Sequence, residues 1–198
     1  MKPASLKSIF LAILSSAALL SSCSSSGTPA QYRARFDTSQ GAFVIEVKRE
    51  WAPIGADRFY QLVKSGFYDE ARFFRVAPGF VIQWGIARDP ILNSQWKDKI
   101  IPDDPVKEAN MAGYVSFASR GPNTRTTQIF LNLANNLQLD SMGFAAFGRV
   151  TEGLDVFSRI YAGYSAQPPD QALIEQQGNA YLGQNFPKLD YIKTARIE

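Results

Sequence analysis

The sequence predicts a mainly β protein that folds as one domain. Two observations support this class. Several short segments alternate apolar and polar residues between turn-forming residues, and only two segments have clear helical periodicity. The length of 198 residues allows one domain with a short appendage. The pattern alone leaves open whether the strands form a barrel or a sandwich, although closing a barrel would remove the exposed strand edges.

The first expected elements are an antiparallel hairpin and a helix. Residues 32–38 and 42–48 alternate in character, and Ser-Gln-Gly at 39–41 predicts the turn between them. A helix is expected over residues 53–65, because it opens on a proline and apolar residues recur three and four positions apart. Gly66 is a natural stop for this helix.

Five more strands, a second helix and a closing strand are expected after this point. The five strands are predicted at 73–76, 80–84, 114–118, 129–133 and 144–150. Thr151 can cap a helix over 151–160, whose buried face would be Val156, Phe157 and Ile160. Residues 162–185 contain a Pro-Pro pair and little apolar periodicity, which indicates a long loop with at most one helical turn. A final strand is predicted at 189–197.

The composition excludes several kinds of chemistry. The chain has no histidine, so neither a Ser-His nor a Cys-His nucleophile is available. No His-containing metal site is possible and no spaced Asp/Glu cluster replaces one, so we expect neither a metal nor a cofactor. The net charge is +3, and losing Lys2 and Lys7 with a leader would lower it to about +1. Since no basic run remains, nucleic-acid binding is not expected.

The N-terminal residues predict export. Residues 1–22 combine a basic start with an apolar run at 9–20 and end in small residues, as in a signal peptide. The apolar run is too short for a membrane span, which needs about 20 apolar residues. Cys23 is the single cysteine, so the chain can form no internal disulfide. Residues 23–31 are rich in serine and indicate a flexible tether before a domain at 32–198.

The position of Cys23 resembles the lipobox of bacterial lipoproteins. That resemblance implies a lipid-modified Cys23 as the first residue of the mature chain. The serine that follows it favours the outer membrane, on its periplasmic side. The alternative is an ordinary signal peptide cleaved nearby, which would leave a soluble periplasmic protein and no role for Cys23.

Five short motifs carry the strongest functional signal, and they are residues 73–85, 121–124, 128–130, 139–140 and 147–150. The first reads FFRVAPGFVIQWG, and the second and third read GPNT and QIF. In this order and spacing the motifs resemble those of the cyclophilins, which isomerise peptide bonds before proline. The resemblance extends over residues 32–198. It implies a closed eight-stranded antiparallel β-barrel capped by a helix at each end, and a peptidyl-prolyl cis-trans isomerase.

The resemblance also implies roles for individual residues. Arg75 would donate to the prolyl nitrogen of the twisted amide, and Gln83 would assist by holding the peptide. The expected substrate-binding residues are Phe80, Val81, Ala118, Ser119, Gln128, Phe130, Leu139 and Phe144. Strand alternation gives independent support, because Phe130 lies on the face opposite its apolar neighbours and Gln83 on the face opposite Trp84. The expected partners are proline-containing, unfolded or flexible envelope proteins, bound by a monomer.

Some residues depart from the pattern of the family. The departures are Phe74 and Phe144 at frequent histidine positions, Val81 for methionine, Trp84 for glycine and Gln138 for tryptophan. Trp84, Phe74 and Phe144 support an alternative function, a catalytically weak module that binds proline-containing peptides as a chaperone or scaffold. The sequence also leaves open that Arg75 forms a surface ion pair and that Phe80, Phe130 and Leu139 are ordinary core residues.

Overall fold

The fold was analysed in a computed structural model, which describes Met1 and residues 27–198. Cys23 and, apart from Met1, the predicted signal peptide lie outside the described residues. The strands are β1 (Gln31–Thr38), β2 (Gly41–Lys48), β3 (Arg75–Ala77), β4 (Val81–Trp84), β5 (Tyr114–Phe117), β6 (Ile129–Asn132), β7 (Ala146–Glu152) and β8 (Ile192–Ile197). The helices are α1 (Pro53–Lys64), α2 (Pro90–Trp96), α3 (Gln138–Ser141), the 3₁₀ helix η1 (Leu154–Ser158) and α4 (Gln171–Asn185). None of the described helices combines the length and the apolar character that a membrane span requires.

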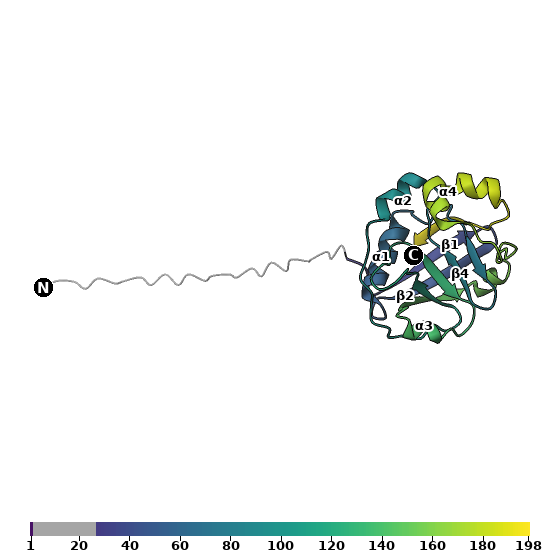
Figure 1. The fold of residues 1–198 in the computed structure, drawn as a ribbon. Helices are drawn as coiled ribbons and strands as arrows, with labels where there is room; N and C mark the ends of the chain where they lie inside the picture. The colour runs from purple at the N-terminus through teal and green to yellow at the C-terminus, as the bar shows by residue number, and fades with distance from the viewer. Residues whose placement is uncertain (2–26) are drawn as a thin grey trace.

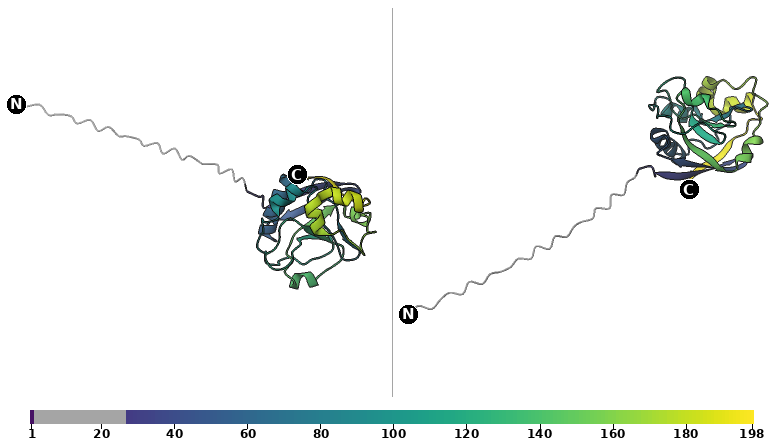
Figure 2. Two further views of the ribbon diagram at one scale, coloured as in Figure 1. Left: turned by 45° about the horizontal axis from the view of Figure 1, so that its top comes forward. Right: turned by 90° about the horizontal axis from the view of Figure 1, so that it is seen from below.

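The eight strands form one antiparallel sheet in the order β3-β4-β6-β5-β7-β2-β1-β8, which curls around the hydrophobic core (Figures 1 and 2). The prediction of a mainly β, eight-stranded fold is confirmed, but the closed barrel is wrong because β3 and β8 remain edge strands. Among the described residues, only an isolated bridge between Arg72 and Tyr191 and a few backbone hydrogen bonds join the two edges. With three residues, β3 is too short to continue a ladder onto β8.

The β1–β2 hairpin and α1 form as the sequence predicts. Thr38 lies opposite Gly41 across the turn, where Gly41 has a φ of 123°. On the inner face, the ring of Phe36 stacks on the ring of Phe43 at 4.9 Å, and Phe59 of α1 stacks on Phe36 at 6.1 Å. These contacts place the main hydrophobic core between α1 and the sheet.

The predicted helix at 151–160 is wrong. β7 continues through Thr151 and Glu152, since Glu152 still pairs with Val44 of β2. Gly153 then turns the chain with a φ of 72°, where a β-carbon would come within 2.1 Å of a backbone oxygen. Only the short helix η1 follows it. The predicted buried residues of this segment, Val156, Phe157 and Ile160, are nevertheless all buried.

Two helices that the sequence reading missed lie side by side at one end of the molecule, with α3 at the opposite end (Figure 1). α2 follows Asp89, whose carboxylate caps it by accepting a hydrogen bond from the Leu92 backbone. α4 occupies most of the segment that was expected to be a loop, and Asp170 caps it in the same way. Gly178 interrupts α4 with φ 61° and ψ −145°, so α4 consists of two short helical pieces joined at a kink.

Candidate active site

A groove of about 1000 Å³ lies on the outer face of β4 and β6. All ten substrate-site residues that the sequence predicts line it, namely Arg75, Phe80, Val81, Gln83, Ala118, Ser119, Gln128, Phe130, Leu139 and Phe144. They come from five separate stretches of the chain, so the fold brings residues that are distant in the sequence into one groove.

Strand pairing positions the polar centre of the groove. Arg75 on β3 lies directly opposite Gln83 on β4, and Gln83 lies opposite Phe130 on β6. Because successive side chains of a strand point to opposite faces, Ile82 and Trp84 enter the core while Gln83 faces the groove. Three neighbouring strands therefore present Arg75, Gln83 and Phe130 side by side.

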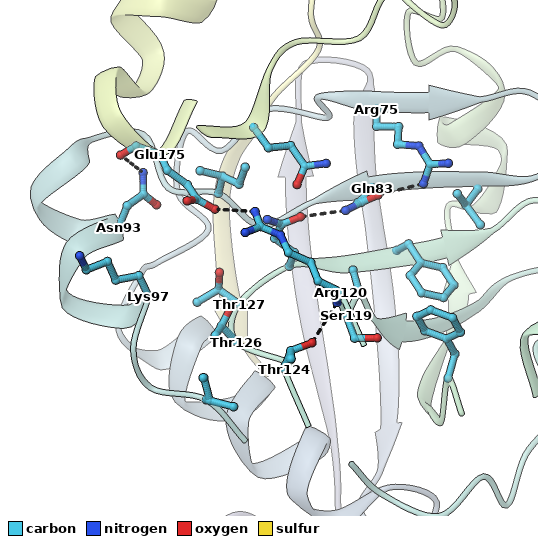
Figure 3. Close-up of a pocket in the computed structure, with 18 of the residues that line it drawn as sticks. Arg75, Gln83, Asn93, Lys97, Ser119, Arg120, Thr124, Thr126, Thr127 and Glu175 are labelled. Atoms are coloured by element: carbon cyan, nitrogen blue, oxygen red, sulfur yellow. Dashed lines mark hydrogen bonds and ion pairs between the residues drawn. The ribbon is translucent and has the colours of Figure 1, made fainter. Parts of the chain in front are cut away.

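A chain of hydrogen bonds fixes these polar groups. Nη1 of Arg75 donates to Oε1 of Gln83 at 3.1 Å (Figure 3), and Nε2 of Gln83 donates to Oε1 of Gln128 at 2.8 Å. The guanidinium carbon of Arg75 also lies 6.0 Å from the centre of the Phe80 ring. Within the described residues Arg75 makes no ion pair, which removes the alternative of a surface ion pair.

An apolar slot lies beside Arg75 and is separate from the main core. Val81, Phe130 and Leu139 form its buried cluster, and the partly buried residues that pack against it are Ala77, Phe80, Ala118 and Phe144. The Phe130 and Phe144 rings meet edge to face with their centres 5.6 Å apart. Leu139 reaches the slot from α3, whose Asp140 accepts hydrogen bonds from the backbone and side chain of Asn110. The slot offers a site for a small apolar ring.

The groove continues into a polar arm that the sequence reading missed. We define this arm by Asn93 and Lys97 of the α2 region, Arg120 and Thr124 of the loop between β5 and β6, and Gln171 and Glu175 of α4. Arg120 lies 3.6 Å from the Glu175 carboxylate, and its backbone N–H donates to the hydroxyl of Thr124 at 2.9 Å (Figure 3). The Asp-Pro start of α2 and the aspartate before α4 are helix-capping signals that could have revealed both helices.

Two residues that depart from the family pattern lie away from the groove. Trp84 is fully buried in the main core, where its ring meets the Phe73 ring at 5.4 Å. Phe74 is buried under α4 in a second cluster with Ile174 and Leu182. Gln138 is exposed on α3, whereas Phe144 and Val81 do line the groove.

The arrangement suits a reaction that needs no nucleophile. A guanidinium held next to an apolar slot can donate to a prolyl nitrogen whose lone pair becomes available as the amide twists. Within the described residues no group of three or more His, Cys, Asp or Glu side chains is placed to hold a metal ion.

Comparison with known proteins agrees with this geometry. The family described as "Cyclophilin type peptidyl-prolyl cis-trans isomerase/CLD" matches residues 33–178. The peptidyl-prolyl cis-trans isomerase ppi1 of Schizosaccharomyces pombe is 40% identical over 129 residues, which cover 62% of this chain and 81% of the relative. The isomerase CYP18-2 of Arabidopsis thaliana is 33% identical over 133 residues, covering 63% and 77% of the two chains.

A solved structure supports the fold. The crystal structure of a cyclophilin-type isomerase of Cryptosporidium parvum superposes with a TM-score of 0.63 at 22% identity, and the match covers 85% of this chain and 98% of the other. A second structure of that protein was determined in the presence of the dipeptide Ala-Pro. From the family match and the sequence identities, the chain belongs to the cyclophilin-type peptidyl-prolyl cis-trans isomerase family.

Proposed function

We propose that the protein accelerates cis–trans isomerisation of X-Pro bonds with Arg75 as the group that stabilises the twisted amide. The observation that carries this proposal is the Arg75 guanidinium, which pairs with no carboxylate among residues 27–198, is fixed by Gln83 and lies next to the apolar slot. Rotation about the amide has a barrier of about 18–20 kcal/mol, because resonance gives the C–N bond double-bond character. A donor that gains its acceptor only in the twisted state lowers this barrier without holding the ground state more tightly.

The other groove residues complete the site in this proposal. Gln83 and Gln128 orient the guanidinium and hold the peptide backbone, together with the chain at 118–119. The proline ring fills the slot, which is lined by Phe80, Val81, Phe130, Leu139 and Phe144. Clients are proline-containing segments of unfolded or flexible proteins, whose uncatalysed isomerisation takes tens to hundreds of seconds.

The test is an isomerisation assay by NMR exchange on a short Ala-Pro peptide, using the full chain purified in mild detergent. We expect clear acceleration by the wild type and a loss of about 10²–10³ in kcat/KM for Arg75→Ala, the scale seen when one preorganised donor is removed. Arg149→Ala is the matched control, since Arg149 is an exposed arginine on β7 paired with Glu46 outside the groove. A folded wild type without acceleration would favour the alternative of a peptide-binding module without turnover.

The structure weakens that alternative. Of the departures that suggested it, Trp84 and Phe74 are buried away from the groove, so neither changes the surface that a peptide would meet. Phe144 does line the groove, but there it extends the apolar slot by packing on Phe130. A binding module would also need no donor such as Arg75 aimed at a twisted amide.

We further propose that the protein is exported in a bacterium and anchored through a lipid on Cys23, where it acts as a monomer on envelope proteins. This proposal rests on the leader-like residues 1–22 and on the place of the single cysteine. Expression with a radiolabelled fatty acid tests it. The wild type should take up label and sediment with membranes, and Cys23→Ser should do neither. Equal release of both proteins into the periplasm would favour a soluble periplasmic enzyme.

A further inference from the structure

The polar arm is a rigidly held wall of the groove. Asn93 ties α2 to the preceding loop, since its side chain accepts from the Ala87 backbone N–H at 2.7 Å and donates to the Ala87 carbonyl at 3.2 Å. It also donates to the Glu175 carbonyl of α4 at 3.5 Å (Figure 3). At the kink of α4, the Asn179 backbone donates to the Arg88 carbonyl at 2.7 Å. These bonds fix the backbones of α2 and α4, beside which Lys97 and Glu175 stand, relative to each other.

The charges along the groove are unbalanced. Its lining residues include the cations Arg75, Lys97 and Arg120 but a single carboxylate, Glu175. Lys97 forms no ion pair in the part of the chain that the structure describes. The groove should therefore attract negative charge from a bound segment, and all the more where the peptide excludes water.

The pair between Arg120 and Glu175 is easily exchanged. The Arg120 side chain is 71% exposed and the Glu175 side chain 39% exposed, with 3.6 Å between their charged atoms. An ion pair in such surroundings contributes little to stability, so a carboxylate of a bound peptide can replace Glu175 as the partner of Arg120. In contrast, a basic side chain would have to compete with Arg120 for Glu175 while facing Lys97.

We propose that the polar arm selects client segments with an acidic side chain close to the X-Pro dipeptide, which Arg120 and Lys97 bind while Glu175 limits the preference. This inference rests on the proposed isomerase function and adds a class of substrate to it. Arg120, Lys97 and Glu175 act as specificity-determining residues. The rotation itself remains the task of the groove centre around Arg75.

The experiment compares peptides that differ by one charge. Each contains Ala-Pro and carries Glu, Gln or Lys two residues before the proline, and a second set carries the same residues two positions after it. NMR exchange gives kcat/KM for the full chain in mild detergent. In at least one set we expect the order Glu, then Gln, then Lys, with steps of about two- to fivefold, the scale of exposed ion pairs. The preference should shrink when the salt concentration rises from 0.02 M to 0.5 M, since it is electrostatic.

Variants assign the preference to residues. Arg120→Gln should lower the ratio of Glu to Gln peptide towards one, and Glu175→Gln should raise it, because Arg120 is then free. Arg149→Gln is the matched control and should leave the ratio unchanged, since Arg149 pairs with Glu46 and does not line the groove. Opposite effects from the two members of one pair would not arise from a merely structural disturbance.

Failure of the inference and failure of the function give different results. Equal acceleration of all peptides in both sets, or a preference for Lys, would leave the isomerase intact and overturn the acidic selectivity. A ratio that Arg120→Gln and Glu175→Gln do not move in opposite directions would also overturn it. If the folded wild type accelerates no peptide, the proposed function fails and this inference fails with it.

Discussion

Gln83 accepts a hydrogen bond from the guanidinium of Arg75 at 3.1 Å, and the two residues lie directly opposite each other on β3 and β4. The amide of Gln83 has a second task, because its nitrogen donates to Gln128 at 2.8 Å. The orientation of Arg75 is therefore set from the strand beside it, and a second glutamine sets the orientation of the first. This relationship makes Gln83 a positioning residue for Arg75.

Replacing Gln83 should impair turnover more than peptide binding. In Gln83→Leu the guanidinium loses its acceptor, and a hydrogen bond to a charged group contributes about 1.5–3 kcal/mol, so we expect kcat to fall about tenfold or more. A double-mutant cycle with Arg75→Ala should be strongly non-additive, because both changes remove the same fixed donor. Gln61→Leu, on the exposed face of α1, is the control for the substitution itself. Additive losses would show that Gln83 acts independently of Arg75.

Substitutions at Trp84 should affect stability and leave turnover intact. The ring is fully buried and meets Phe73, Phe43 and Phe36, with ring centres 5.4, 6.2 and 6.3 Å away. Trp84→Ala should lower the free energy of unfolding by about 3–5 kcal/mol in urea titrations. Trp84→Phe should lower the free energy of unfolding by less than Trp84→Ala does. The smaller ring keeps part of the packing, and the change removes a buried indole N–H for which no hydrogen-bond partner is described. Loss of activity in stable, folded Trp84→Phe would contradict a core role.

The centre of the site could be predicted because strand alternation and short motifs are local signals. Val81 and Gln83 share one face of β4, and Phe130 faces the same way on β6, as the period of two requires. The roles of these residues came from a family resemblance, since alternation alone cannot distinguish a groove from an ordinary core.

The rest of the groove depended on contacts between distant parts of the chain. α4 buries Ile174, Gly178 and Leu182, and a stripe with glycine at its centre gives little apolar periodicity. The partners of that stripe include Phe74, about 100 residues earlier in the chain, so nothing local indicates the packing. Whether β3 and β8 close a barrel is likewise decided by pairing between distant segments.

Gly178 should be required for the docking of α4. Its φ is 61°, and an added β-carbon would lie 2.2 Å from the Arg88 carbonyl oxygen. Gly178→Ala should therefore loosen α4, with a lower melting temperature and faster amide hydrogen exchange between residues 171 and 185. Gly183→Ala, in the same helix, is the matched control because, apart from its chain neighbours and the nearby backbone of its own helix, no atom lies within 4 Å of its added β-carbon. We expect Gly183→Ala to stabilise the protein by about 0.5–1 kcal/mol, and similar effects from both changes would contradict the proposed constraint.

The ion pair between Asp57 and Arg49 should give a pH-dependent contribution to stability. Hydrogen bonds from Arg49, each 2.7 Å long, hold the pKa of the Asp57 carboxyl below its ordinary value of 3.8. Because the pKa is lower in the folded state, the stabilisation is complete above the ordinary value and disappears as the pH falls through the lowered one. Asp57→Asn should therefore lower the urea midpoint slightly at pH 7, and the difference from the wild type should vanish in strong acid.

The control must be a variant whose effect on stability does not depend on pH. Arg159→Gln is unsuitable, because Arg159 lowers the pKa of its partner Asp155 and its loss would also have a pH-dependent effect. Lys64→Gln, which removes a cation that lies over the Tyr60 ring, should instead shift the midpoint equally at both pH values. A difference between Asp57→Asn and the wild type that persists unchanged in strong acid would mean that the pair stabilises the fold through packing rather than charge.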